Sequence, residues 1–347
     1  MSLADATGAL IVLGLTAYAV LAGADFGTGV WDVTAGRGPL GVRMRRRVES
    51  SMGPVWEANH VWLIFVLVIF WTGFPVAFGS VASTLYVPLF LAAIGIILRG
   101  VAFVTRGVVR AGTGGEHAYR LLFALSSLLT PFFLAAALGG VASGRVPVGN
   151  AAGDPVTSWW NPTSIIAGTL AVVTGAHLAA VYLSADARRA GDADLAEALR
   201  RRALGSGLVA GAIALGGLAV LREDARPLYD EIVGDGLPFV VLSAAGGLAT
   251  LALVARRANG LARLTAAVAV GALLWAWVVG QYPALLPGEL TVDEAAAGHA
   301  TLVALLVSVG LGVLVLAPSL AYLFRLVLAG RLDKDPSPEA PEGAPLP

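Results

Sequence analysis

A small set of polar side chains stands inside segments of the chain that are otherwise apolar enough to cross a lipid bilayer. They are Asp25, Glu57, Asn59, His60, Arg99 and His177. An ionisable group at membrane depth loses its hydration, so it is retained where it meets a partner, lines a water path or serves a function. Carboxylates in such places carry protons in pumps and transporters. Proton transfer is therefore the first chemistry that these residues suggest.

The elements that position these residues are predicted to be membrane-spanning helices. Hydrophobic residues make up 57% of 347 positions and charged residues 13%, with a mean hydropathy of +0.79. A span needs about 20 mostly apolar residues, and continuous apolar runs exclude the alternation of a membrane β-barrel. We predict an all-α polytopic protein with nine spans: Gly8–Val30, Val55–Phe78, Thr84–Val104, Tyr119–Ala142, Thr163–Ser184, Ala203–Leu221, Pro238–Ala255, Leu261–Gly280 and His299–Leu328.

The basic residues predict the orientation of these spans, because Lys and Arg collect in short cytoplasmic loops. The loops after the first, third, fifth and seventh spans, together with the C-terminal end, hold 19 of the 23 basic residues. We therefore expect the N-terminus outside and the C-terminus inside. The net charge of zero gives no indication of a nucleic-acid partner.

The domain organisation is predicted as one integral membrane domain over residues 1–330, followed by a disordered cytoplasmic tail over 331–347, which is rich in Pro, Glu and Ala. The similar segments AYAVLAGADFG and AHLAAVYLSADA, each with an Ala-Asp step before an Arg-bearing loop, suggest a parallel repeat of 1–145 and 155–285. The spans would then form two four-helix bundles, with residues 298–329 as an additional helix. Chance similarity between Ala-rich helices is the alternative.

Asp25 and Glu57 are expected at similar depth, because the first span runs towards the cytoplasm and the second starts there. Two such carboxylates could pass protons inward through waters. In the alternative, Asp25 terminates its helix with the help of Gly27 and Gly29, and Glu57 complements the positive dipole end of the second span. Arg99 could neutralise one of the acids, but we favour its snorkelling to the cytoplasmic headgroups.

The histidines are candidate haem ligands, since imidazole is a common axial ligand of haem iron. His60 and His177 are the two histidines well inside spans, and a bis-histidine site would require them to face each other. A lone intramembrane histidine is more often hydrogen-bonded to a neighbour, and this is our expectation for both. The chain has no cysteine, which excludes thiolate chemistry and iron–sulfur clusters in it. We expect neither a metal nor a cofactor bound directly to this chain.

Two motifs carry a resemblance to a known family. The segments GADFGTGVW at Gly23–Trp31 and WEANHVWL at Trp56–Leu63, separated by an Arg-rich loop, resemble subunit II of cytochrome bd-type quinol oxidases. Nine spans with the N-terminus outside agree with that family, so the resemblance covers nearly the whole chain. The C-terminal half resembles the family in topology more than in amino-acid sequence.

The resemblance implies a haem-free subunit II with no catalytic centre of its own. It implies a partner, subunit I, that holds haems b and d and oxidises quinol while oxygen is reduced to water. A small single-span accessory subunit is a further candidate partner, and the location implied is the bacterial cytoplasmic membrane.

The family resemblance also implies roles for individual residues. Asp25 and Glu57 would line a path that brings cytoplasmic protons towards subunit I. Positions that would support this path are matched by Trp56, Asn59 and Trp62 of the second segment and by Arg99, which follows the apolar run of the third span.

The sequence also departs from the family pattern. Ala22 stands where family members often carry an additional acid, and Ala24 replaces the usual Phe. His60 occupies a position where Gln or Glu is more familiar, and with an unperturbed pKa near 6.5 it could share proton transfer with Glu57.

Two other functions remain open at this point. A proton-coupled secondary transporter would have a similar composition, but it would place polar clusters near the bilayer centre. Here Leu67 and Val172 are apolar mid-span positions. A purely structural anchor would differ in leaving Asp25 and Glu57 replaceable.

Overall fold

The computed structural model describes residues 2–52, 56–105 and 114–328, except for the side chains of some residues beside the gaps, Trp56 and Glu57 among them. The chain divides into two compact units, Met1–Ala297 and Gly298–Pro347. In the described residues, eight helices are long and apolar enough to cross a membrane, or nine if one bent pair counts as a single span. The prediction of an all-helical, multi-pass membrane protein is confirmed at this level.

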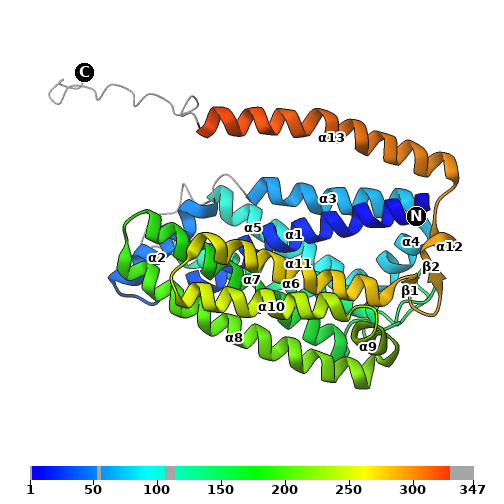
Figure 1. Cartoon of the computed structure of the whole chain (residues 1–347), viewed down its shortest axis with the longest axis horizontal. Helices are drawn as coiled ribbons and strands as arrows, with labels where there is room; N and C mark the ends of the chain where they lie inside the picture. Colours follow the sequence, from blue (N-terminus) through cyan, green and yellow to red (C-terminus); the bar gives the residue numbers. More distant parts are fainter. Residues whose placement is uncertain (1, 53–55, 106–113, 329–347) are drawn as a thin grey trace. The chain divides into compact units, whose positions relative to one another are not determined.

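The first unit holds nearly all of the elements (Figure 1). The helices are α1 (Leu3–Val33), α2 (Pro39–Met52), α3 (Trp56–Gly73), α4 (Pro75–Thr84), α5 (Tyr86–Thr105), α6 (Gly114–Ala142), α7 (Pro162–Arg189), α8 (Ala193–Asp224), α9 (Arg226–Val233), α10 (Leu237–Ala255), α11 (Asn259–Gln281) and α12 (Val292–Ala295). A short antiparallel hairpin of β1 (Ala284–Leu286) and β2 (Leu290–Thr291) precedes α12. The second unit contains α13 (His299–Leu328), which has Pro318 inside it.

Local sequence explains where the long helices begin. Ser2 caps α1 in a reciprocal capping box with Asp5, which satisfies backbone donors that a helix start leaves open. Asn161 caps α7 through the amide of Ser164. Asp192 caps α8, so this helix begins ten residues before the span predicted from Ala203.

The second predicted span is wrong at its C-terminal end. We expected one span over Val55–Phe78, but α3 ends at Gly73 and α4 starts at Pro75, with a bend of 119° between the two helices. Proline lacks an amide hydrogen and disfavours the helical region for the residue before it. Phe74 accordingly has φ −138° and ψ 62°.

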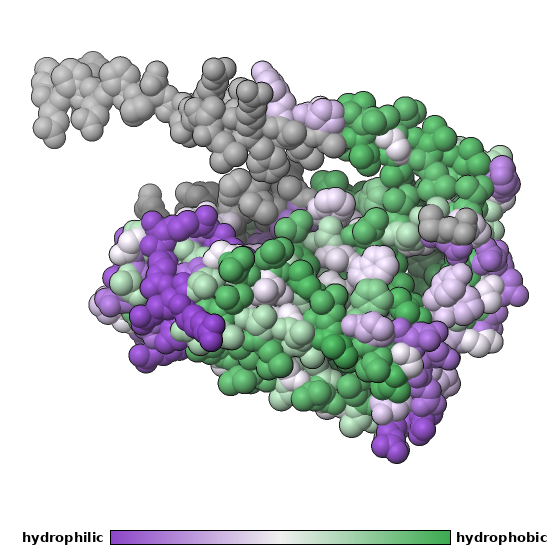
Figure 2. Space-filling view, in the orientation of Figure 1, coloured by the Kyte–Doolittle hydropathy of each residue, from purple (hydrophilic) through white to green (hydrophobic). Residues whose placement is uncertain are grey.

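Helices α1 and α7 pack against each other and against most of the other long helices. α1 contacts α3, α6, α7 and α11, whereas α7 contacts α6, α8 and α11. One face of the first unit, over α8, α10 and α11, is hydrophobic between two hydrophilic ends, as Figure 2 shows. Among the candidate spans of the described residues, α7 has the largest buried share, half of its most apolar window.

Candidate functional site

Asp25 lies within α1 and does not end it. The helix continues for eight residues beyond Asp25, to Val33, which is about 12 Å at 1.5 Å per residue. The alternative in which Asp25 terminates the helix is therefore wrong. Its carboxylate is buried, with 7% of the side chain exposed. A buried carboxylate in an apolar bundle requires compensation.

Arg99 of α5 provides that compensation. Its Nη2 atom lies 2.7 Å from Asp25 Oδ1 and also donates to the backbone oxygen of Asp25 at 2.8 Å. None of the Arg99 side chain is exposed. The expectation that Arg99 snorkels to the headgroups is thus wrong, because a buried partner is within reach and repays the desolvation of the guanidinium.

The Arg99 guanidinium is fixed by further contacts from two helices. Nη1 donates to Ser127 Oγ of α6 at 3.0 Å. The guanidinium carbon lies 4.7 Å from the ring centre of Phe26 and 4.9 Å from that of Phe123, distances at which aromatic rings attract a cation. The Asp25–Arg99 pair is therefore held between α1, α5 and α6 in one orientation.

The glycines of the first motif permit this arrangement. A Cβ atom at Gly27 would overlap the carbonyl group of Gly175 in α7, and one at Gly29 would overlap Ser127 Oγ. Small residues let helix backbones approach closely in membranes. Gly27 and Gly29 therefore bring α1 against α7 and α6, on either side of the helix that carries Asp25.

The second motif packs on the same stretch of α1. Asn59 is buried, and its Nδ2 atom lies 3.4 Å from the backbone oxygen of Leu21. The His60 ring meets Tyr18 and Phe26 edge-on, with ring centres 6.3 and 6.0 Å apart. The first turns of α3 thus lie beside the segment of α1 that ends at Asp25.

The other predicted members of the second motif are less well placed by the structure. Trp62 is 39% exposed and packs its ring edge against Phe65, so it does not face Asp25 as a buried neighbour. The side chains of Trp56 and Glu57 lie outside the described residues. The predicted pairing of Glu57 with Asp25 is therefore not tested.

The ion pair and a neighbouring tyrosine contain buried polar atoms that make no hydrogen bond to the described residues. Among the described residues, Asp25 Oδ2, Arg99 Nε and Tyr18 Oη are buried and have no hydrogen-bond partner. Tyr18 is close enough to act electrostatically with both members of the pair. Unsatisfied buried polar atoms are rare and point to a functional or strained place. Asp25 thus has one oxygen fixed by Arg99 and a second one available to accept a proton.

His177 has a structural partner. Its Nδ1 atom lies 2.9 Å from the backbone oxygen of Ala203 in α8, and the imidazole is buried. A Cβ at Gly207 would come within 3 Å of the ring. This agrees with the expectation of a hydrogen-bonded histidine between α7 and α8. Within the described residues, no three His, Cys, Asp or Glu side chains form a group that could hold a metal ion.

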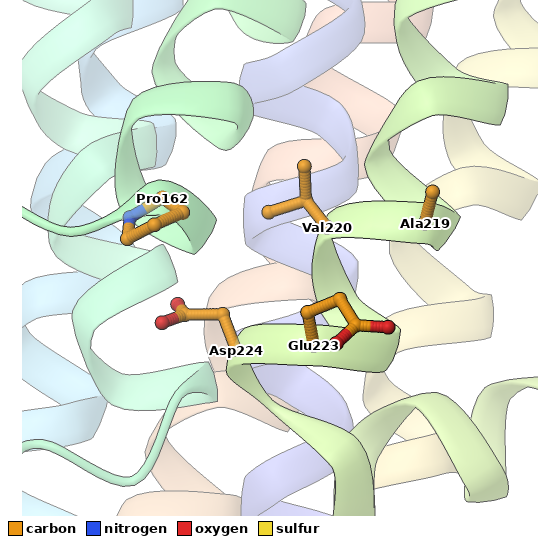
Figure 3. A pocket seen from close by; sticks show the side chains of 5 residues that line it. All are labelled: Pro162, Ala219, Val220, Glu223 and Asp224. Atoms are coloured by element: carbon orange, nitrogen blue, oxygen red, sulfur yellow. The ribbon is translucent and has the colours of Figure 1, made fainter.

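A second polar cluster lies at the opposite end of the bundle. Asp224 at the end of α8 pairs with Arg145 at 2.6 Å and accepts from the Thr163 hydroxyl at 2.6 Å. It borders an open pocket of about 400 Å³, lined by Pro162, Ala219, Val220, Glu223 and Asp224 (Figure 3). These contacts tie α8 to the start of α7, and the pocket is remote in sequence from both motifs.

Several contributors to the site could not be identified from the sequence. Ser127 accepts a hydrogen bond from Arg99, and the carbonyl group of Gly175 is in close contact with Gly27. Ser127 and Gly175 belong to no motif that we singled out. The helix α2 was also missed. Its sequence signal is the spacing of Met44 and Val48, apolar residues four positions apart in an Arg-rich segment, and both side chains are buried in the structure.

Comparisons with known proteins place these features in context. The sequence profile of the family described as cytochrome bd terminal oxidase subunit II matches residues 3–327. A cytochrome bd ubiquinol oxidase subunit 2 from Bacillus subtilis (strain 168) is 32% identical over 108 residues, so that the match spans only 31% of this chain and 31% of that relative. A chain of the solved bd oxidase from Geobacillus thermodenitrificans superposes with a TM-score of 0.74 at 25% identity, over 94% of this chain and 99% of that one.

Proposed function

The chain belongs to the cytochrome bd terminal oxidase subunit II family, and from this membership we propose that it is the haem-free second subunit of a membrane quinol:oxygen oxidoreductase. In the proposed complex it packs against a subunit I that holds haems b and d and oxidises quinol. The complex lies in a bacterial cytoplasmic membrane and could include a small single-span subunit. The chemistry of oxygen reduction belongs to the haems of subunit I.

The proposed topology has the N-terminus outside and two four-helix units in one orientation, followed by α13. The asymmetry of basic residues between alternate loops supports the orientation. The similar places of α1 and α7 support the repeat, because each helix contacts several others. Each also carries an aspartate paired with an arginine: Asp25 with Arg99, and Asp186 with Arg263 at 2.6 Å.

The proposed role of this subunit is to conduct cytoplasmic protons towards subunit I, with Asp25 and Glu57 as the carriers and His60 as a possible third. The observation that carries the proposal is the buried Asp25–Arg99 pair. An ion pair needed only for stability could be replaced by apolar residues without loss. Its position in a family motif, with one carboxylate oxygen left unpartnered among the described residues, favours a functional role.

Each residue of the pair has a distinct task in this mechanism. Arg99 binds Oδ1, which leaves Oδ2 as the oxygen that takes up a proton. Once a proton is bound there, the attraction between the two side chains weakens, which favours release of the proton to the next acceptor. Phe26 and Phe123 keep the guanidinium in place during this cycle. Asn59 holds α3 against α1.

The test is to purify the complex from its native membrane and record its reduced-minus-oxidised optical spectrum and its quinol-driven oxygen uptake. Haem b and d bands that accompany a larger partner are expected. Asp25→Asn and Glu57→Gln should each lower turnover at least about tenfold with unchanged haem content. Asp230→Asn, which alters an exposed acid paired with Arg226, is the matched control and should not.

The outcomes separate the proposal from the other functions. A colourless protein without a partner that moves protons or solutes in vesicles would establish a transporter instead. Full turnover in both Asp25→Asn and Glu57→Gln would leave this chain as a structural anchor.

A further inference from the structure

A second buried aspartate lies near the end of α1. Asp32 is the penultimate residue of the helix, and only 6% of its surface is exposed. No hydrogen bond or ion pair among the described residues involves its carboxylate. A carboxylate in the last turn of a helix also faces the negative end of the helix dipole. Burial and the dipole both oppose a negative charge here, so its placement requires an explanation.

Charged groups from three other helices lie near this end of α1. Arg45 and Glu49 of α2 and Arg120 of α6 act on it electrostatically. From α8, Arg202 donates to the backbone carbonyl two residues beyond Asp32 at 3.4 Å. Arg45 and Arg120 favour the ionised carboxylate, whereas burial and Glu49 oppose it. These opposing influences suit a group that both takes up and releases a proton.

Asp32 and Asp25 lie on the same side of α1. They are seven residues apart, which is about two helical turns and about 10 Å along the axis. Gly29 lies between them and packs closely on Ser127 Oγ. The same hydroxyl accepts a hydrogen bond from Arg99, which binds Asp25. We call Asp32, Ser127, Arg99 and Asp25 the polar strip, because the two acids share one side of α1 and the other two residues meet that side at Gly29 and Asp25.

We propose that Asp32 is a proton relay at the cytoplasmic end of this strip, which receives protons from the inner side and delivers them to Asp25. The inference rests on the proposed function, because it assigns an inner end to the path that Asp25 serves. Each transfer moves one proton from a water or an acid to the Asp32 carboxylate and then onward to Asp25. Asp32 returns to its ionised form, so nothing is consumed.

The experiment uses the whole purified complex and measures proton uptake with a pH-sensitive dye when the quinol-reduced enzyme meets oxygen. Asp32→Asn should slow proton uptake severalfold, with a larger effect at alkaline pH, where protons are scarce. Asp32→Glu should restore most of the rate. Asp194→Asn is the matched control, because this acid is also near the inner end but 84% of its side chain is exposed, and it should behave as wild type.

A purely structural role for Asp32 predicts different results. If Asp32 only balances Arg45, the double variant Asp32→Asn with Arg45→Gln restores the charge balance and the uptake rate, and the relay is overturned. Wild-type uptake in Asp32→Asn at alkaline pH overturns it as well. If Asp25→Asn blocks uptake while Asp32→Asn does not, the inference fails and the proposed function stands. If neither variant slows uptake, the proposed function fails too.

Discussion

Replacing Arg99 with methionine leaves the Asp25 carboxylate buried without its cation. The substitution removes hydrogen bonds to Asp25 Oδ1, to the Asp25 backbone oxygen and to Ser127 Oγ. Breaking one partner of a buried ion pair costs about 3–5 kcal/mol, most of which is the penalty of the uncompensated charge. With an unfolding entropy of about 2.1 cal/mol/K per residue over a chain of this length, about 4–7 °C of melting temperature should be lost.

The assay is thermal unfolding of the detergent-solubilised complex, followed by the loss of its haem absorbance and by the fluorescence of the protein. Arg226→Met is the matched control, since this arginine pairs with Asp230 across side chains that are 58% and 55% exposed. Such a pair contributes about 0–1 kcal/mol. The double variant Arg99→Met with Asp25→Asn carries no unpaired charge, so it should recover part of the lost stability.

The comparison between single and double variants is the critical one. If the double variant is no more stable than Arg99→Met, the single substitution destabilises the complex because packing against the two phenylalanine rings is lost. The unpaired Asp25 carboxylate is then not the cause. An Arg99→Met complex that melts with the Arg226→Met control would refute the reasoning, because it would mean that the pair is not desolvated in the assembled membrane protein.

Three further predictions concern other parts of the site and the fold. Gly27→Ala should destabilise the complex by about 1–3 kcal/mol through overpacking, because its methyl group overlaps the Gly175 carbonyl; a melting temperature equal to wild type would contradict this close approach. His60→Gln should slow proton uptake if the imidazole shares proton transfer, whereas unchanged oxygen consumption and uptake would exclude His60 from the path. Hydrogen bonds from the backbone and side chain of Thr291 hold the pKa of Glu294 below its usual value, so their stabilisation of α12 is present above the unfolded pKa and is lost as pH falls through the folded one. The protection of the α12 amides from hydrogen exchange, measured relative to their intrinsic exchange rates at each pH, should therefore fall on acidification, and Glu294→Ala should remove that pH dependence.

The sequence alone was sufficient for the membrane class, the helical architecture and the family. Spans can be predicted because a bilayer imposes a length and an apolar composition on each of them, and both are local properties. Asp25 and Arg99 also stood out in the sequence, since charged residues at that depth are rare and costly. The bend at Pro75 had a local signal too, although we interpreted Val55–Phe78 as one span.

Only the tertiary structure decided which partners these side chains meet. Asp25 and Arg99 are 74 residues apart, and no local pattern says that the arginine turns inward to the acid instead of outward to the headgroups. The choice follows from helix packing, because α6 packs against both α1 and α5, and the guanidinium of Arg99 there meets a carboxylate, a hydroxyl and two aromatic rings at once. Asp32 gave no sequence signal because it follows the first motif near a polar loop, and its burial depends on α2 and α6. Burial and ion pairing are properties of contacts between distant segments, so the tertiary structure was needed to establish them.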